Sequence, residues 1–149
     1  MNHALRSRAF SLVEILIVVI ILGILAAIVI PQFTNASSNA RNSSTASDLT
    51  ILRKQLDLFT LQHNSVPPQI TGMWTLLTSR SNTSETSVAA PSGTANGPYV
   101  IAPPQNPWNN YTTITTAATD TNAGWYYTAT TSSYSIYVRN ADGTINYTY

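Results

Sequence analysis

The chain has 149 residues and a formal net charge of +1, and Asp, Glu, Lys and Arg make up only 9% of it. A balance this close to neutral does not point to a nucleic-acid partner, and the lack of cysteine excludes a disulfide framework. The sequence offers no catalytic set, since its histidines are only His3 and His63 and it has no glycine-rich phosphate loop, so we expect no enzyme. The length allows one domain and a membrane anchor.

The first predicted element is an apolar helix near the N-terminus. From Phe10 to Ile30 the only ionisable side chain is Glu14. A helix needs about 20 apolar residues to cross a hydrocarbon core about 30 Å thick, so this segment predicts one transmembrane span. Arg6 and Arg8 precede it, which predicts a cytoplasmic leader and an outward-facing remainder.

Glu14 is a candidate functional residue, because a carboxylate in a membrane segment is costly and needs a partner. A cut between Ala9 and Phe10 would create one, since a new α-amino group is mostly protonated near neutral pH. Glu14 follows Phe10 by one helical turn, so the two can pair within a chain or between neighbouring copies. The alternative is a plain signal anchor whose glutamate lies near the membrane interface.

A second helical region is predicted over residues 34–63, and Pro31 is expected to bend the helix before it. Spacings of 3, 4 and 3 predict a buried stripe: Leu49, Leu52, Leu56 and Phe59. A narrower stripe lies on nearly the opposite side and needs a second cover, for which a neighbouring subunit is the candidate: Ile51, Leu58 and Leu61. A flexible linker is the alternative interpretation of the Ser- and Asn-rich start of this region.

The rest of the chain predicts a small head. Residues 64–123 are expected to be mostly loop with a short helix within 70–79, and His63 is expected to face solvent. Aromatic and β-branched residues predict three strands: residues 124–128, 134–138 and 144–149.

The expected fold is therefore α+β, with a small C-terminal antiparallel sheet packed on a long N-terminal helix. Cleavage before Phe10 would divide the chain into three parts: a leader at 1–9, a transmembrane helix at 10–33, and an outward-facing head at 34–149. The head contains a helix at 34–63, a loop region at 64–123 and a sheet at 124–149.

The segment RAFSLVEILIVVIILGILAAIVIPQF resembles the N-terminal signature of the type IV pilin-like family. The resemblance implies that a prepilin peptidase cleaves between Ala9 and Phe10 and that Phe10 is then N-methylated. Glu14 matches the assembly glutamate of the family, and Pro31 matches its helix-kinking proline. The residue before the cut is usually glycine in the family and is Ala9 here.

A second string, DLTILRKQLDLFTLQHNSVPP, resembles a helix end of the major pseudopilins of type II secretion systems, and a GPY…NP string extends this likeness weakly. Those proteins often bind calcium in C-terminal loops, so the resemblance implies a possible site at Asp120, Asn140 and Asp142. Calcium takes six to eight oxygen ligands, which two carboxylates and backbone carbonyls would supply weakly. Ordinary turn residues are the competing interpretation.

The resemblance implies a structural subunit of a helical filament, most specifically the major pseudopilin of a type II secretion system, which takes part in protein export. The implied partners are further copies of this chain, prepilin peptidase, an inner-membrane assembly platform, minor pseudopilins and, before assembly, membrane lipid. The implied location is the bacterial inner membrane and then a periplasmic or surface filament. Two alternatives stay open: a type IV pilin for adhesion, motility or DNA uptake, and a membrane-tethered extracellular binding domain.

Overall fold

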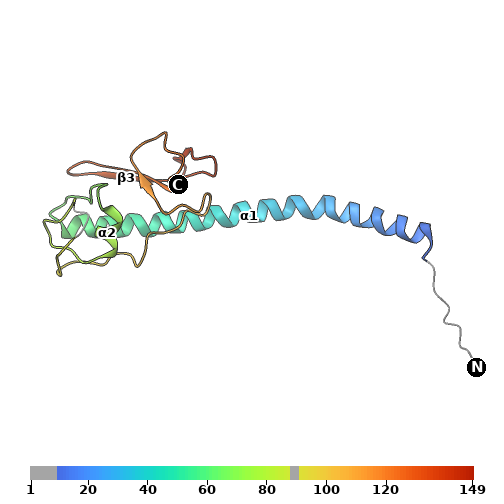
Figure 1. Ribbon diagram of the computed structural model, residues 1–149, viewed down its shortest axis with the longest axis horizontal. Coiled ribbons are helices and arrows are strands. Elements are labelled where there is room, and N and C mark those ends of the chain that lie inside the picture. Colours follow the sequence, from blue (N-terminus) through green and yellow to red (C-terminus); the bar gives the residue numbers. More distant parts are fainter. Residues whose placement is uncertain (1–9, 88–90) are drawn as a thin grey trace, which may run out of the picture. The chain divides into compact units, whose positions relative to one another are not determined.

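The computed structural model describes residues 10–87 and 91–149 (Figure 1). The described residues form these elements, in chain order: α1 (Leu12–Gln62), α2 (Met73–Thr78), β1 (Ile114–Thr115), β2 (Trp125–Ala129), β3 (Tyr134–Arg139) and β4 (Ile145–Asn146). They belong to two compact units, one ending at Ala40 and one spanning Arg41–Tyr149, and α1 contributes to both. The predicted α+β fold, with one long N-terminal helix and a small C-terminal sheet, is confirmed.

In the first unit, the described residues belong almost entirely to α1. The helix continues through Pro31 without interruption. Proline removes one backbone donor from a helix interior, and the bend predicted at Pro31 stays a prediction.

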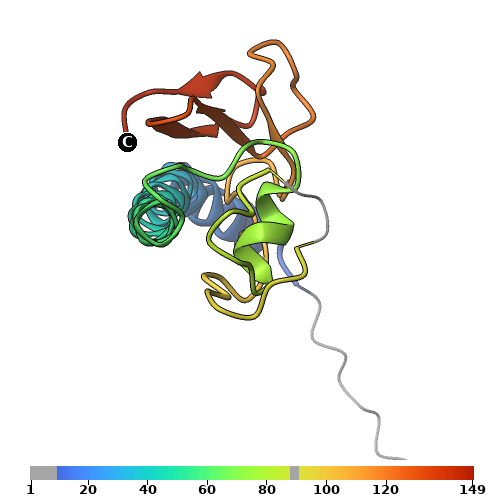
Figure 2. The same cartoon turned by 90° about the vertical axis from the view of Figure 1, so that its left-hand side faces the viewer.

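In the second unit, α1 supplies one side of the hydrophobic core. The predicted stripe is confirmed, since its four side chains are buried: Leu49, Leu52, Leu56 and Phe59. The sheet packs on this stripe through Trp125, Tyr127, Ile136 and Val138, and α2 adds Met73, Leu76 and Leu77. Figure 2 shows α1 nearly end-on, with the sheet above it and α2 at its side.

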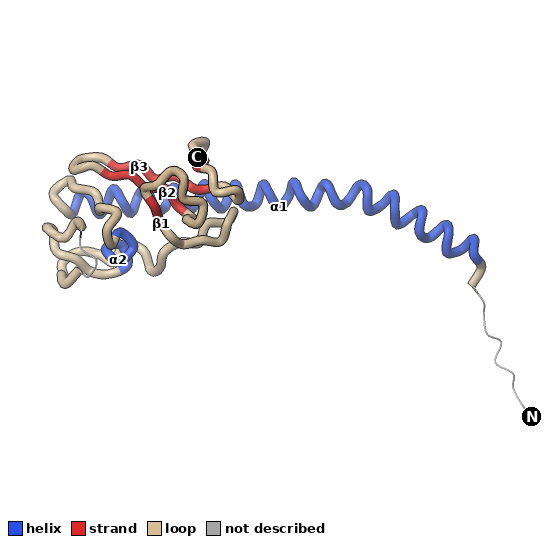
Figure 3. The backbone as a smooth tube through the Cα atoms, turned by 45° about the horizontal axis from the view of Figure 1, so that its top comes forward, coloured by secondary structure: helices blue, strands red, loops and turns tan. Residues whose placement is uncertain are grey.

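The sheet has the order β1-β2-β3-β4 and is mixed, where a purely antiparallel sheet was expected (Figure 3). β2 and β3 form an antiparallel hairpin in which Trp125 lies opposite Val138. β1 pairs with β2 in parallel through Ile114 and Trp125. The expected strand at 144–149 is shorter than predicted, because β4 contains only Ile145 and Asn146.

The C-terminal end of α1 has two residues in the left-handed region, Asn64 and Ser65. The N–H of Ser65 donates to the carbonyl of Thr60 at 2.9 Å, which closes the last turn. His63 is fully buried at this end, so its predicted solvent exposure was wrong. Its ring stacks on Phe59 with centroids 3.7 Å apart, and its Nε2 lies 2.9 Å from the Ser81 hydroxyl.

Candidate functional site

The start of α1 is closed by two reciprocal hydrogen bonds between Ser11 and Glu14. The backbone N–H of Glu14 donates to Ser11 Oγ at 3.1 Å, and the backbone N–H of Ser11 donates to the Glu14 carboxylate at 2.9 Å. This arrangement is a capping box, which supplies partners for N–H groups that a helix start leaves unpaired. The sequence reasoning identified Glu14 and missed Ser11, although Ser-x-x-Glu before an apolar run is the signal for this motif.

Phe10 directly precedes the capping box and is 76% exposed. Ala9 and the leader lie outside the described residues. Pairing between Glu14 and the Phe10 amine therefore stays a prediction, since cleavage itself creates that amine. In the uncut chain the capping box already gives Glu14 partners without an ionic contact.

The apolar segment that follows is exposed in the part of the chain that the structure describes. Among the described residues, α1 is the one helix long and apolar enough to cross a membrane, and its most apolar part is not buried. Large side chains from Leu12 to Ile30 are about half exposed or more. Contiguous apolar patches beyond a few hundred Å² are rare on monomeric soluble proteins, so this surface requires lipid or other helices.

A second apolar surface lies on the head. The narrower stripe of α1 is exposed: Ile51, Leu58 and Leu61. Ile51 also lines a shallow groove of about 490 Å³ with Tyr99, Val100 and the fully exposed Ile101. Asp48 lies at this groove, and its partial burial raises its pKa above the usual aspartate value.

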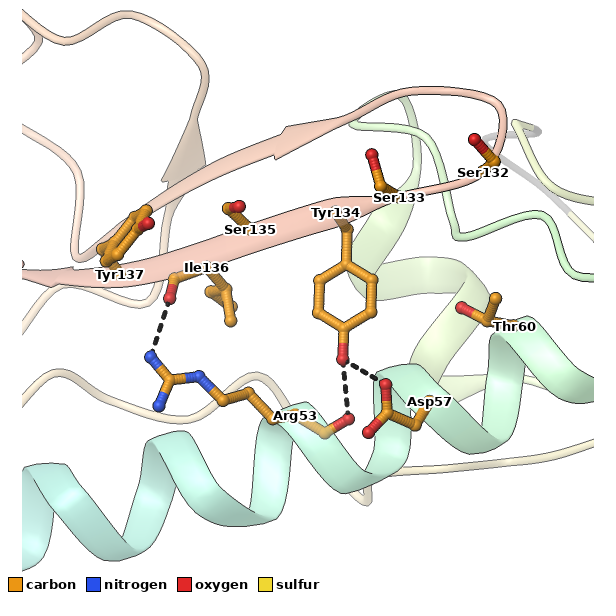
Figure 4. Close-up of a pocket in the computed structure, with 9 residues that line it drawn as sticks. All are labelled: Arg53, Asp57, Thr60, Ser132, Ser133, Tyr134, Ser135, Ile136 and Tyr137. Atoms are coloured by element: carbon orange, nitrogen blue, oxygen red, sulfur yellow. Dashed lines mark hydrogen bonds between the residues drawn. The ribbon is translucent and has the colours of Figure 1, made fainter.

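A hollow of about 530 Å³ on the head lies between α1 and β3 (Figure 4). Tyr134 donates to the Asp57 carboxylate at 2.6 Å and to the Arg53 carbonyl at 3.0 Å, and the Arg53 guanidinium donates to the Ile136 carbonyl at 3.3 Å. Burial, and then the Asp57 hydrogen bond, raise the pKa of Tyr134 far above the usual tyrosine value, so its hydroxyl remains a donor. These hydrogen bonds join the β2–β3 hairpin to α1.

The three predicted calcium ligands each take part in a local turn. Asp142 Oδ1 accepts from the hydroxyl and the backbone N–H of Thr144 at 2.7 and 2.9 Å, and these hydrogen bonds lower the pKa of Asp142. Asp120 Oδ1 accepts from the Asn122 backbone at 3.0 Å, and Asn140 Oδ1 accepts from Asn146 at 3.0 Å. Within the described parts of the chain, no three Asp, Glu, His or Cys side chains are grouped to hold a metal ion.

Two protein families match the chain. The family described as "Type II secretion system (T2SS), protein G" matches residues 32–135, and the "Prokaryotic N-terminal methylation motif" matches residues 5–30. The first match covers most of the head, and the second covers the end of the leader and most of the apolar segment. No solved structure matches the chain significantly.

Curated relatives give the same result. The chain is 31% identical to the type II secretion system core protein G of Aeromonas hydrophila over 70% of each chain. It is 32% identical to that of Klebsiella pneumoniae, over 70% of this chain and 71% of the relative. It is 30% identical to that of Pseudomonas aeruginosa, again over 70% of each. With its methylation motif, exposed apolar helix and α+β head, the chain belongs to the protein G family of type II secretion systems.

Proposed function

We propose that this chain is the major pseudopilin of a type II secretion system, the repeating subunit of a helical filament that takes part in protein export. The observation that carries the proposal is the apolar part of α1, which is exposed from Leu12 to Ile30 on a chain whose head belongs to the protein G family. Such a surface is stable in two environments, the bilayer and the interior of a helical bundle.

Before assembly, the apolar helix anchors the subunit in the inner membrane, with the leader on the cytoplasmic side and the head outside. This orientation is supported by Arg6 and Arg8, because basic residues favour the cytoplasmic side of a membrane helix. Prepilin peptidase then cuts before Phe10, and methylation of the new terminus follows. The methylation-motif match over residues 5–30 supports both steps.

During assembly, the apolar helices leave the bilayer and pack in the filament interior. Glu14 of an incoming subunit pairs with the Phe10 amine of the subunit before it, since a charge in an apolar interior needs a partner. On the head, the exposed apolar stripe of Ile51 and Leu58 and the neighbouring Ile101 contact an adjacent copy. The exposure of these side chains in a single chain supports that role.

Deletion of the gene in its natural host tests the proposal against its nearest alternative. We expect the exported proteins to stay in the periplasm, while long surface pili, motility and DNA uptake are unchanged. Mass spectrometry of the culture medium and electron microscopy of the cells measure these outcomes. Loss of long pili with normal export would instead identify a type IV pilin, and re-expression of the intact gene is the control.

A second experiment, overproduction of the chain, separates the filament subunit from a tethered binding domain. A filament subunit that is overproduced with its secretion machinery is expected to yield sheared filaments that contain this chain. A chain that stays wholly in the membrane fraction under those conditions would favour the binding domain.

A further inference from the structure

Arg139 is the last residue of β3, and its side chain is fully buried on the face of the sheet that points away from α1. Ile136 and Val138 lie in the core against α1, so the alternation of a strand places Tyr137 and Arg139 on the other face. Where strands pair in antiparallel, as β3 does with β2 and β4, the face away from the core is commonly solvated. Here the loop between β1 and β2 contacts Arg139 and leaves it 0% exposed.

Two of the three guanidinium nitrogens of Arg139 donate to backbone carbonyls, while its buried Nε has no hydrogen-bond partner among the described residues. Its Nη2 donates to the carbonyls of Ala117 and Ala118 at 2.6 and 3.2 Å, and its Nη1 donates to the carbonyl of Gly143. The carbon atom of the guanidinium lies 5.9 Å from the centroid of the Tyr126 ring. In the described chain, each hydrogen-bond acceptor of this cation is thus an uncharged carbonyl. A buried cation is costly unless such groups compensate it.

These carbonyls belong to two loops that meet over the sheet. Ala117 and Ala118 lie in the connection between the parallel strands β1 and β2, which spans only residues 116–124. Parallel strands usually need a crossover of about a dozen residues or more, so this short loop must be held in place. Gly143 lies in the turn between β3 and β4, with a φ of 81°, and a Cβ there would come within 2.6 Å of Thr121 Cβ.

Several carbonyl oxygens that converge from two loops are the kind of ligand set that calcium takes in proteins. The geometry points to a different cation at this junction: we propose that the Arg139 guanidinium replaces a metal ion and cross-links the two loops, so that the head folds and works without calcium. Asp120, Asn140 and Asp142 fit this assignment, because their Oδ1 atoms serve local turns.

The first test measures the thermal unfolding of the full-length processed chain in detergent by tryptophan fluorescence, with millimolar calcium chloride or with a chelator. We expect melting temperatures that agree within about 1 °C, since a ligand shifts stability only if it binds the native state. A site saturated about 100-fold would raise the melting temperature by roughly 5 °C or more, and such a rise would overturn the proposal.

The second test removes the cation and supplies it from solution. Arg139→Ala leaves three carbonyls without their donor and is expected to lower the melting temperature by about 5 °C or more. Ethylguanidinium, added at millimolar concentration, is expected to restore part of that loss, while equimolar potassium chloride does not. The matched control is Arg80→Ala, because Arg80 also donates to a carbonyl, that of Thr94, but is exposed. Unchanged melting of Arg139→Ala, or no rescue, contradicts the proposal.

A third test uses a pair of variants and covers the case in which Arg139→Ala does not fold. Arg139→Lys retains the positive charge, and Arg139→Met retains a long side chain without it. If a cation is what the junction requires, the lysine variant melts at the higher temperature. A methionine variant that melts at an equal or higher temperature contradicts the role of Arg139 as a built-in cation.

Discussion

Leu56→Ala is expected to lower the free energy of unfolding of the head by about 2–5 kcal/mol, the usual range for truncating a buried leucine. Leu56 is 0% exposed and belongs to the core that α1, α2 and the sheet share. A fragment that begins near Thr34 contains the whole compact unit Arg41–Tyr149 and is expected to be a soluble monomer. Urea unfolding of this fragment measures the change.

The matched control for Leu56→Ala is Ile51→Ala on the opposite side of α1. Ile51 is 54% exposed, so its truncation is expected to change the free energy of unfolding by less than about 0.5 kcal/mol. Two similar losses would mean that both stripes are buried in the fragment. A loss below about 0.5 kcal/mol for Leu56→Ala would place the core on another face of α1.

Glu14→Gln is expected to block filament assembly while leaving membrane insertion and cleavage intact. Glutamine can take the same position in a capping box as glutamate, so the start of α1 is preserved while the charge is lost. Removal of one partner of a buried ion pair costs about 3–5 kcal/mol, which corresponds to a filament yield lower by roughly 100-fold or more. Cell fractionation would show a normal mature band with almost no sheared filaments.

Ser11→Ala is the control that separates capping from charge. It removes the hydroxyl that accepts from the Glu14 N–H but keeps the carboxylate. A lost cap costs about 1 kcal/mol, so this variant is expected to assemble at close to the normal yield. If Ser11→Ala abolished filaments and Glu14→Gln did not, the charge of Glu14 would have no role in assembly.

The elements that depend on local periodicity could be predicted from the sequence. The spacing of Leu49, Leu52, Leu56 and Phe59 identified the buried face of α1, and the aromatic runs identified β2 and β3. The second apolar stripe, Ile51, Leu58 and Leu61, could also be predicted from spacing. The spacing does not indicate what covers it. The apolar run and its single carboxylate likewise identified the segment that the methylation motif matches.

Features that depend on distant contacts could not be predicted in this way. β1 is two residues long and pairs with β2 across a loop, so it has no period to detect. His63 is buried where its ring stacks on Phe59 and its Nε2 meets the hydroxyl of Ser81, which is 18 positions away. Asn106 is buried because it donates to the carbonyls of Gly124 and Arg139, which no local pattern indicates.

Arg139 is the clearest case of such a long-range effect. Alternation along β3 predicts that an arginine outside the core face is solvated, and arginine is rarely buried without a partner. Its burial depends on the loop at Ala117 and the turn at Gly143, which come from separate parts of the sequence. The same long-range contacts bring the carbonyls of Ala117, Ala118 and Gly143 together, and no local pattern indicates which backbone oxygens meet there.

Intact-mass spectrometry of sheared filaments tests the central claim, that this chain is a processed filament subunit, most directly. The predicted result is one dominant species that begins at Phe10 and carries one added methyl group. A matched Ala9→Trp variant, whose bulky side chain is expected to block the cut, should give no such species and few filaments. Filaments built from chains that retain Met1, or filaments from which this chain is absent, would contradict the claim.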